Sequence, residues 1–217
     1  GSSARMTALF AALAPARRDI CPGVVLLERF VATAPLVAAV ERIAAQAPFR
    51  HLVTPGGGTM SVAMTNCGAA GWVSDRRGYR YTREDPLTGR PWPAMPESFR
   101  ALARAASEAA GFGAFDPDAC LVNRYAPGTS LGSHQDCDEP DGRHPIVSVS
   151  IGLPAVFAWF GATRGGTPTL VPVSDGDVVV FGGPARRGYH GVRRLRDGHH
   201  PLTGRFRYNL TFRRALP

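Results

Sequence analysis

The most informative absence in this sequence is lysine. The 217-residue chain has 25 basic residues, and all of them are arginine. Because no lysine amine is present, the chain cannot form a Schiff base or use lysine as a nucleophile, which excludes those enzyme classes. An arginine-only composition rich in alanine and glycine also fits a GC-rich genome, so the preference for arginine does not by itself indicate a function.

Cysteine and long apolar runs are also scarce. None of the four cysteines forms a C-x-x-C pair, which argues against a structural zinc finger. Scattered cysteines without a signal peptide predict free thiols in the cytoplasm. No apolar run reaches the roughly 18 residues of a membrane-spanning helix, so we expect no membrane association.

Acidic residues are outnumbered by basic ones, 17 to 25, so the formal net charge is +8. This excess favours polyanionic partners, and nucleic acid is the first candidate.

The hydrophobic pattern changes its period along the chain. Residues 33–48 and 96–112 each show one apolar stripe, which predicts two core-packing helices, the first capped by Thr33. From residue 119 onward, short β-rich segments alternate with Gly, Pro and Asp. Helices followed by short strands predict a single α+β domain in which helices pack against an antiparallel sandwich or jelly roll.

The stretch "SLGSHQDCDEPDGRHP", residues 130–145, has two interpretations. Such a polar run is typical of a solvated loop, but an extended backbone points His134 and Asp136 to the same side. With His190, which follows the predicted strand "DVVVFGG", they form the two-histidine, one-carboxylate set that suits non-haem Fe(II). A zinc hydrolase is an alternative use of this set. Four other histidines compete for the role of third ligand: His51, His144, His199 and His200.

The segment "RYNLTFR" has two unlike faces. By strand alternation Tyr208, Leu210 and Phe212 share the apolar face. The polar side chains of the opposite face are those of Arg207, Asn209, Thr211 and Arg213. This segment is either a sheet edge with its polar face in water or a clamp for carboxylates, which arginine binds in a bidentate manner. In "LVNRYAPG" the side chains of Asn123 and Tyr125 share one face by the same rule and offer further hydrogen bonds.

Together, "CLVNRYAPG", "HQDCDEPDGRHPIVSVSIGLP", "DVVVFGG", "YHG" and "HPLTGRFRYNLTFR" closely resemble the bacterial AlkB family of Fe(II)- and 2-oxoglutarate-dependent dioxygenases. The likeness also includes "TPGGGTMSVAMTNCGAAGWVSDRRGYRY" and "PWPAMP". The resemblance implies a double-stranded β-helix core, a jelly-roll relative, over about residues 115–217. It also implies a nucleotide-recognition lid over about residues 51–96, within one domain of residues 1–217.

The resemblance also implies a role for each matching residue. The implied iron ligands are His134, Asp136 and His190. The implied 2-oxoglutarate contacts are Asn123, Tyr125, Arg207, Asn209 and Arg213. Trp72 corresponds to a lid aromatic that stacks on the extracted base, and Asp138 to an acid near the amino edge of that base. The implied lining of the nucleic-acid groove is Thr54, Met64, Tyr79 and Arg164.

The activity implied by this resemblance is oxidative demethylation of N-alkylated bases, such as 1-methyladenine and 3-methylcytosine. We expect a monomer that acts on single- or double-stranded DNA, with RNA as a second substrate. It would consume Fe(II)-activated O2 and 2-oxoglutarate, and release formaldehyde, succinate and CO2. The alternatives are a relative that acts mainly on RNA or on protein, and a nucleic-acid binder with an inactive metal site.

Overall fold

The computed structural model describes residues 16–217, and the first 15 residues of the predicted domain lie outside this range. The helices are α2 (Ala34–Gln46), α3 (Glu97–Ala109) and the 3-10 turn η1 (Gly183–Ala185). The strands before α3 are β1 (Ala16–Cys21), β2 (Val24–Glu28), β3 (Ala63–Gly68), β4 (Gly71–Asp75) and β5 (Gly78–Thr82). The strands after α3 are β6 (Ala119–Tyr125), β7 (Leu131–His134), β8 (Ile146–Gly152), β9 (Ala155–Gly161), β10 (Thr169–Val173), β11 (Val178–Phe181), β12 (Tyr189–Val192) and β13 (Arg207–Arg213).

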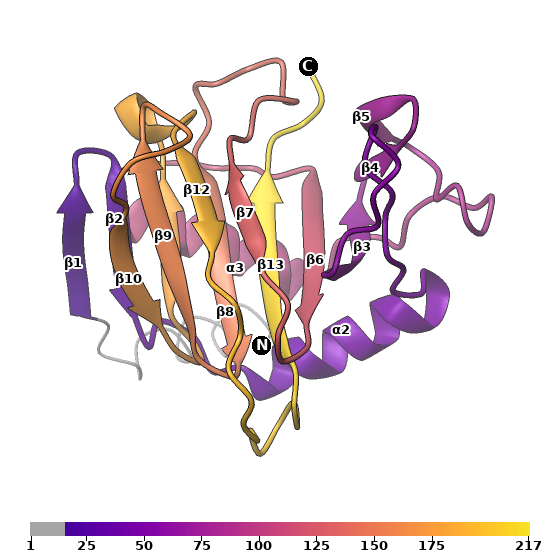
Figure 1. Ribbon diagram of the computed structural model, residues 1–217, viewed down its shortest axis with the longest axis horizontal. Coiled ribbons are helices and arrows are strands. Elements are labelled where there is room, and N and C mark those ends of the chain that lie inside the picture. Colours follow the sequence, from indigo (N-terminus) through magenta and orange to yellow (C-terminus); the bar gives the residue numbers. More distant parts are fainter. Residues whose placement is uncertain (1–15) are drawn as a thin grey trace.

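Two antiparallel sheets form a sandwich with helices on one side. The large sheet has the order β1-β2-β11-β8-β13-β6-β3, and the small sheet has the order β10-β9-β12-β7. In Figure 1 the small sheet lies in front of the large one, α2 and α3 lie on the other side of the large sheet, and the β4–β5 ribbon projects beyond β3. This arrangement confirms the predicted α+β class with a jelly-roll core.

The middle of the large sheet is covered on both faces, which explains the continuous apolar runs of β2 and β11. In β11, Val178 and Val180 pack in the core beneath the helices, whereas Val179 and Phe181 pack in the core between the sheets. The strand β8 departs from this pattern, because its middle contains Ser148 among apolar neighbours. Polar residues on the inner face of the large sheet therefore mark the place where the sandwich encloses something other than hydrocarbon.

Both predicted helices form, but the cap of the first is different from the prediction. Thr33 makes no side-chain hydrogen bond to the helix backbone. Its hydroxyl instead donates to Asp175 Oδ2 at 2.9 Å, which ties the start of α2 to the turn between β10 and β11. The second helix ends as expected at Gly111, whose positive φ of +86° favours glycine.

Several strands are absent from the sequence-based assignment. The prediction placed His190 directly after the strand that ends near Phe181, but His190 lies inside a strand of its own, β12, after the turn η1. β1, β2 and β7 were also not predicted. The large sheet therefore includes strands from outside residues 115–217, and β3, within the predicted lid range, pairs with β6.

The base of the β4–β5 ribbon is fixed by an ion pair and by close packing around Trp92. Arg50 donates two hydrogen bonds to Asp85, at 2.6 and 2.7 Å, and its guanidinium lies 5.3 Å from the centre of the Trp92 ring. A Cβ atom on Gly71, at the start of the ribbon, would lie 2.4 Å from the same indole. These contacts hold the ribbon in place beside the edge of the large sheet. No helix among residues 16–217 is long and apolar enough to cross a membrane.

Candidate active site

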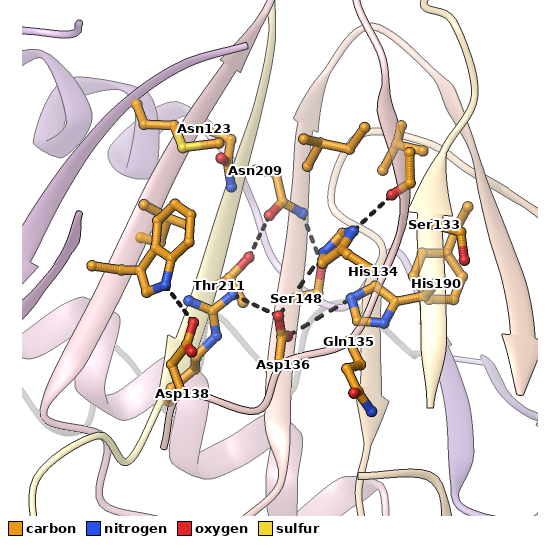
Figure 2. Close-up of a pocket in the computed structure, with 18 of the residues that line it drawn as sticks. Asn123, Ser133, His134, Gln135, Asp136, Asp138, Ser148, His190, Asn209 and Thr211 are labelled. Atoms are coloured by element: carbon orange, nitrogen blue, oxygen red, sulfur yellow. Dashed lines mark hydrogen bonds and ion pairs between the residues drawn. The ribbon is translucent and has the colours of Figure 1, made fainter. Parts of the chain in front are cut away.

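Three predicted metal ligands converge between the two sheets. His134 ends β7, Asp136 follows it, and His190 lies opposite His134 in the neighbouring strand β12. Asp136 Oδ1 is 3.9 Å from His134 Nε2, and Asp136 Oδ2 is 3.7 Å from His190 Nε2. Two ligand atoms each about 2.1 Å from one ion lie at most about 4.2 Å apart, so both pairs fit a single metal ion. Figure 2 shows the three side chains pointing toward a common point.

The backbone fixes the orientation of both imidazoles. His134 Nδ1 lies 2.8 Å from the carbonyl oxygen of Gly132, and His190 Nδ1 lies 3.0 Å from that of Gly188. A carbonyl oxygen only accepts hydrogen bonds, so each Nδ1 carries the proton and each Nε2 presents its lone pair to the site. Among residues 16–217, His134, Asp136 and His190 are the group whose ligand atoms lie close enough to share a metal ion. The four competing histidines do not belong to this group.

Local charges prepare these ligands for a cation. Burial alone would raise the pKa of Asp136, but Arg213, then His190 and His134, hold that pKa well below its usual range. Burial first, and the neighbouring His134 second, lower the pKa of His190 to about 4. Asp136 is therefore ionised and His190 neutral at neutral pH, which are the protonation states that bind metal.

The polar face of β13 is a buried wall of the same cavity. β13 lies between β8 and β6 in the large sheet, so the edge-strand interpretation is wrong. Arg207 Nη2 donates to Ser150 Oγ at 2.9 Å, and Asn209 Nδ2 donates to Ser148 Oγ at 2.8 Å. Arg213 Nη2 lies 3.3 Å from Asp136 Oδ1, at the metal end of the wall.

The wall carries polar atoms without partners, which tests whether a small dicarboxylate fits. Within the described part of the chain, Arg207 Nε and Nη1, Arg213 Nε, Asn123 Oδ1 and Asp136 Oδ2 are buried without a hydrogen-bond partner. Buried polar atoms without partners, donors and acceptors alike, are costly unless a ligand satisfies them. Guanidinium donors around a metal-ligating carboxylate are the groups that 2-oxoglutarate, a dianion and metal chelator, would satisfy.

A cavity of about 430 Å³ connects the wall, the metal ligands and the ribbon. Trp72 on β4 closes one side, and its Nε1 donates to Asp138 Oδ2 at 2.9 Å. Tyr79 stacks on Trp72 with ring centres 5.4 Å apart. Figure 2 shows Asp138 in the same cavity as His134, Asp136 and His190.

All but one of the residues predicted for the site line this cavity. The residues from the strands of the small sheet and from the segments that follow β7 and β9 are His134, Asp136, Asp138, Arg164 and His190. Those from the large sheet are Met64, Asn123, Tyr125, Arg207, Asn209 and Arg213, and those from the ribbon are Trp72 and Tyr79. The exception is Thr54, which closes a turn by accepting a hydrogen bond from the amide of Gly58 at 3.1 Å.

Sequence reasoning missed a buried network beside the metal ligands. Glu139 accepts hydrogen bonds from Arg186 Nη2 and from the Tyr81 hydroxyl, both at 2.7 Å. Arg186 Nη1 also donates to the backbone oxygen of Asp136 at 2.9 Å. The network therefore links the ribbon and the residue after η1 to the backbone of Asp136. Acidic and arginine residues in polar stretches carried no sequence signal that would separate them from surface charges.

Comparisons with known proteins agree with this geometry. A model of the 2OG-Fe(II) oxygenase superfamily matches residues 23–213. The chain is 55% identical to the alpha-ketoglutarate-dependent dioxygenase AlkB of Salmonella typhimurium and 53% identical to that of Escherichia coli, in each case over 97% of this chain and 98% of the relative. The solved structure of OsALKBH1 superposes with a TM-score of 0.83 at 28% identity, over 92% of this chain and 100% of that chain.

The fold and the site thus define an Fe(II)- and 2-oxoglutarate-dependent dioxygenase. Within that class, the chain belongs to the AlkB family.

Proposed function

We propose that this enzyme removes methyl groups by oxidation from N-methylated bases, such as 1-methyladenine and 3-methylcytosine, in DNA and also in RNA. The observation that carries the proposal is the position of three metal-ligand side chains between an arginine wall and an aromatic ribbon, around one cavity. The wall accounts for the co-substrate and the ribbon for a flat, extruded base.

The residues divide this task by position. His134, Asp136 and His190 would hold Fe(II), and Arg207, Asn209 and Arg213, with Asn123 and Tyr125, would hold 2-oxoglutarate. When bound, this pair supplies the O2 activation that oxidises the methyl group while 2-oxoglutarate becomes succinate and CO2. The protein aims this chemistry, since its wall and ligands fix the position of the co-substrate.

The ribbon would receive the base. A methyl group on the Watson–Crick edge is reached only after the base leaves the stack. Trp72, backed by Tyr79, offers a ring that replaces part of the lost stacking. Asp138 already accepts a hydrogen bond at this position and can accept one from the amino group of adenine or cytosine instead. Met64 and Arg164 line the same cavity, and Thr54 is proposed to contact the nucleic acid outside it.

One chain supplies the whole cavity, which supports a monomeric enzyme. We place it in the cytoplasm, where free thiols such as buried Cys67 and Cys120 persist. Both single- and double-stranded DNA are proposed substrates.

The test is turnover with defined oligonucleotides. The enzyme is incubated with Fe(II), ascorbate, 2-oxoglutarate and oligonucleotides that carry 1-methyladenine or 3-methylcytosine, in DNA and in RNA. Formaldehyde and succinate are expected in near-equal amounts, together with the unmodified base by mass spectrometry. Binding without succinate would instead indicate a nucleic-acid binder with an inactive metal site.

A further inference from the structure

A strip of free positive charge follows β12. Arg193, Arg194 and Arg196 are exposed, and within residues 16–217 none of them has an ion pair or a side-chain hydrogen bond. The acid in this segment, Asp197, is already paired with Arg205 at 3.1 Å. The strip therefore presents three guanidinium groups that the described part of the protein does not neutralise.

The backbone holds this strip in place. Leu195 is buried between the arginines, and its amide donates to the carbonyl oxygen of Thr129 at 2.9 Å. In return, the amide of Gly128 donates to the carbonyl oxygen of Leu195 at 2.8 Å, and the amide of Arg193 donates to Val156 at 3.0 Å. The arginines thus extend from a fixed segment, so less conformational entropy is lost when they bind a ligand.

The strip begins at the rim of the cavity. Val192, the residue before it, lines the cavity together with Leu131 and Met60. In Figure 1 the chain continues from β12 along the same face of the molecule, beside the connection from β6 to β7. Arg193 is three residues from His190, or about 10 Å in extended chain.

A further cation lies toward the other end of β12. Arg164 donates to the carbonyl oxygen of Ser133 at 2.9 Å, and its guanidinium lies 5.2 Å from the ring centre of Tyr189. A polyanion that crosses the cavity would therefore meet positive charge on both sides of it.

Building on the proposed function, we propose that Arg193, Arg194 and Arg196 bind backbone phosphates of the substrate strand on one side of the extruded base. Arg193 and Arg196 are three and six residues from His190, which corresponds to about 10 and 20 Å of extended chain. With a rise of about 3.4 Å per nucleotide, these distances span roughly three to six nucleotides from the extruded base. These contacts neutralise phosphates and release counterions, so they add affinity without reading sequence.

The test compares two variants with the same change of charge. One is Arg193→Gln/Arg194→Gln/Arg196→Gln. The control is Arg42→Gln/Arg104→Glu, which removes three units of charge from exposed positions on α2 and α3, across the large sheet from the cavity. Binding of a 3-methylcytosine 15-mer is measured by fluorescence anisotropy, without O2, between about 50 and 200 mM salt.

The strip variant should lose about 2 units of the slope of log affinity against log salt, since each phosphate contact on a single strand contributes roughly 0.7. The control variant should keep the wild-type slope. Equal losses in the two variants would overturn the proposal, because net charge alone would then explain the effect.

Strand position and length provide a second, independent readout. When the lesion is moved to one end of the oligonucleotide, the difference between wild type and the strip variant should disappear, and when it is moved to the other end the difference should persist. A methylated trinucleotide should be turned over equally by both proteins, which also shows that the variant is folded. The proposal is contradicted if the strip variant loses the same affinity with the lesion at either end, or if it turns over the trinucleotide more slowly than the wild type does. If the wild type demethylates neither substrate, the proposed function itself fails.

Discussion

Asp136 is a buried carboxylate with an unusual set of neighbours. Arg213 contacts one of its oxygens, while the other faces His190 and has no hydrogen-bond partner among the described residues. A buried carboxylate oxygen without a partner is costly, and a metal ion would satisfy it.

We expect Asp136→Ala to abolish iron-dependent activity. Under anaerobic conditions with Fe(II) and 2-oxoglutarate, the variant should not develop the charge-transfer absorption of the wild type, and it should release no formaldehyde once O2 is admitted. Asp141→Ala is the matched control, because Asp141 lies in the same polar stretch but pairs with Arg143. If Asp136→Ala remained active, Asp136 would not be a ligand of the catalytic iron.

His190 should make the metal-free protein sensitive to acid. Burial lowers its folded-state pKa to about 4, below the unfolded value near 6.5. The unfolded state therefore binds the proton more tightly, so the stabilisation is complete above pH 6.5 and is lost as the pH falls toward 4. The difference amounts to roughly 3 kcal/mol.

The measurement is urea unfolding of the metal-free protein between pH 7 and pH 4.5. Other groups also titrate in this range, so the informative quantity is the difference between wild type and His190→Gln. The variant should lose less stability on acidification, while His199→Gln, at an exposed position, should behave like wild type. Identical pH profiles for wild type and His190→Gln would show that His190 does not carry the effect.

At the scale of elements, the segment after β7 is joined to the ribbon and to η1 through Glu139. Its carboxylate is almost fully buried and is shared by Arg186 and Tyr81. Glu139→Ala would leave the Arg186 guanidinium buried without its counter-charge, which costs roughly 3–5 kcal/mol. Denaturant unfolding should show this loss, whereas Glu108→Ala, at an exposed position on α3, should change stability by under about 0.5 kcal/mol. A loss below 1 kcal/mol for Glu139→Ala would contradict this account of the network.

The ribbon should matter for the nucleic acid more than for the co-substrate. Trp72→Ala removes the proposed stacking surface, worth about 1–3 kcal/mol per base, so affinity for a methylated oligonucleotide should fall roughly 5- to 150-fold. Trp72→Phe keeps an aromatic ring but loses the hydrogen-bond donor to Asp138. Its affinity for the methylated oligonucleotide should lie between those of the wild type and Trp72→Ala. Binding of 2-oxoglutarate, measured by titration, should be unchanged in both. A parallel loss of 2-oxoglutarate binding would make Trp72 a structural residue.

Alternation explains which elements were predictable. β6, β8 and β13 have clear apolar or two-faced patterns, and the parity of β13 correctly placed Arg207 and Arg213 on one wall. β7, with the sequence LGSH, and β12, with YHGV, are four residues long and carry almost no hydrophobic signal, so they were missed although they hold the two histidines.

Contacts between distant polar residues were not predictable. Glu139 and Arg186 are separated by 47 positions, and neither belongs to a periodic pattern. The same holds for Thr33, whose hydroxyl is directed to Asp175, 142 residues away, and not to its own helix. In each case the tertiary structure determines the hydrogen-bond partner, and the local sequence does not distinguish it from other possible partners.

At the scale of the whole molecule, ligand binding should join the two sheets. The proposed metal ligands come from β7, β12 and the segment after β7, whereas the arginine wall belongs to β13 in the large sheet. A ligand that contacts both sides stabilises only the folded state, by about 2.7 kcal/mol at one hundred times its dissociation constant.

We therefore expect Fe(II) with 2-oxoglutarate, in the absence of O2, to raise the free energy of unfolding of the wild type by that order. The Arg207→Ala variant should be stabilised less, since it lacks one of the two arginines of the wall but keeps His134, Asp136 and His190. Fe(II) alone serves as the control and should stabilise both proteins equally. Equal stabilisation of the two by 2-oxoglutarate would show that Arg207 does not hold it.

The central position of β13 also constrains how the protein is made. β6 and β8 leave the ribosome first, but they have no direct hydrogen bonds to each other, because the strand between them is the last in sequence. Until residues 207–213 are synthesised, the large sheet is split into two parts, each with an unpaired edge that invites aggregation. The nascent chain therefore closes its main sheet and completes its arginine wall in one late event, and such long-range pairing folds slowly.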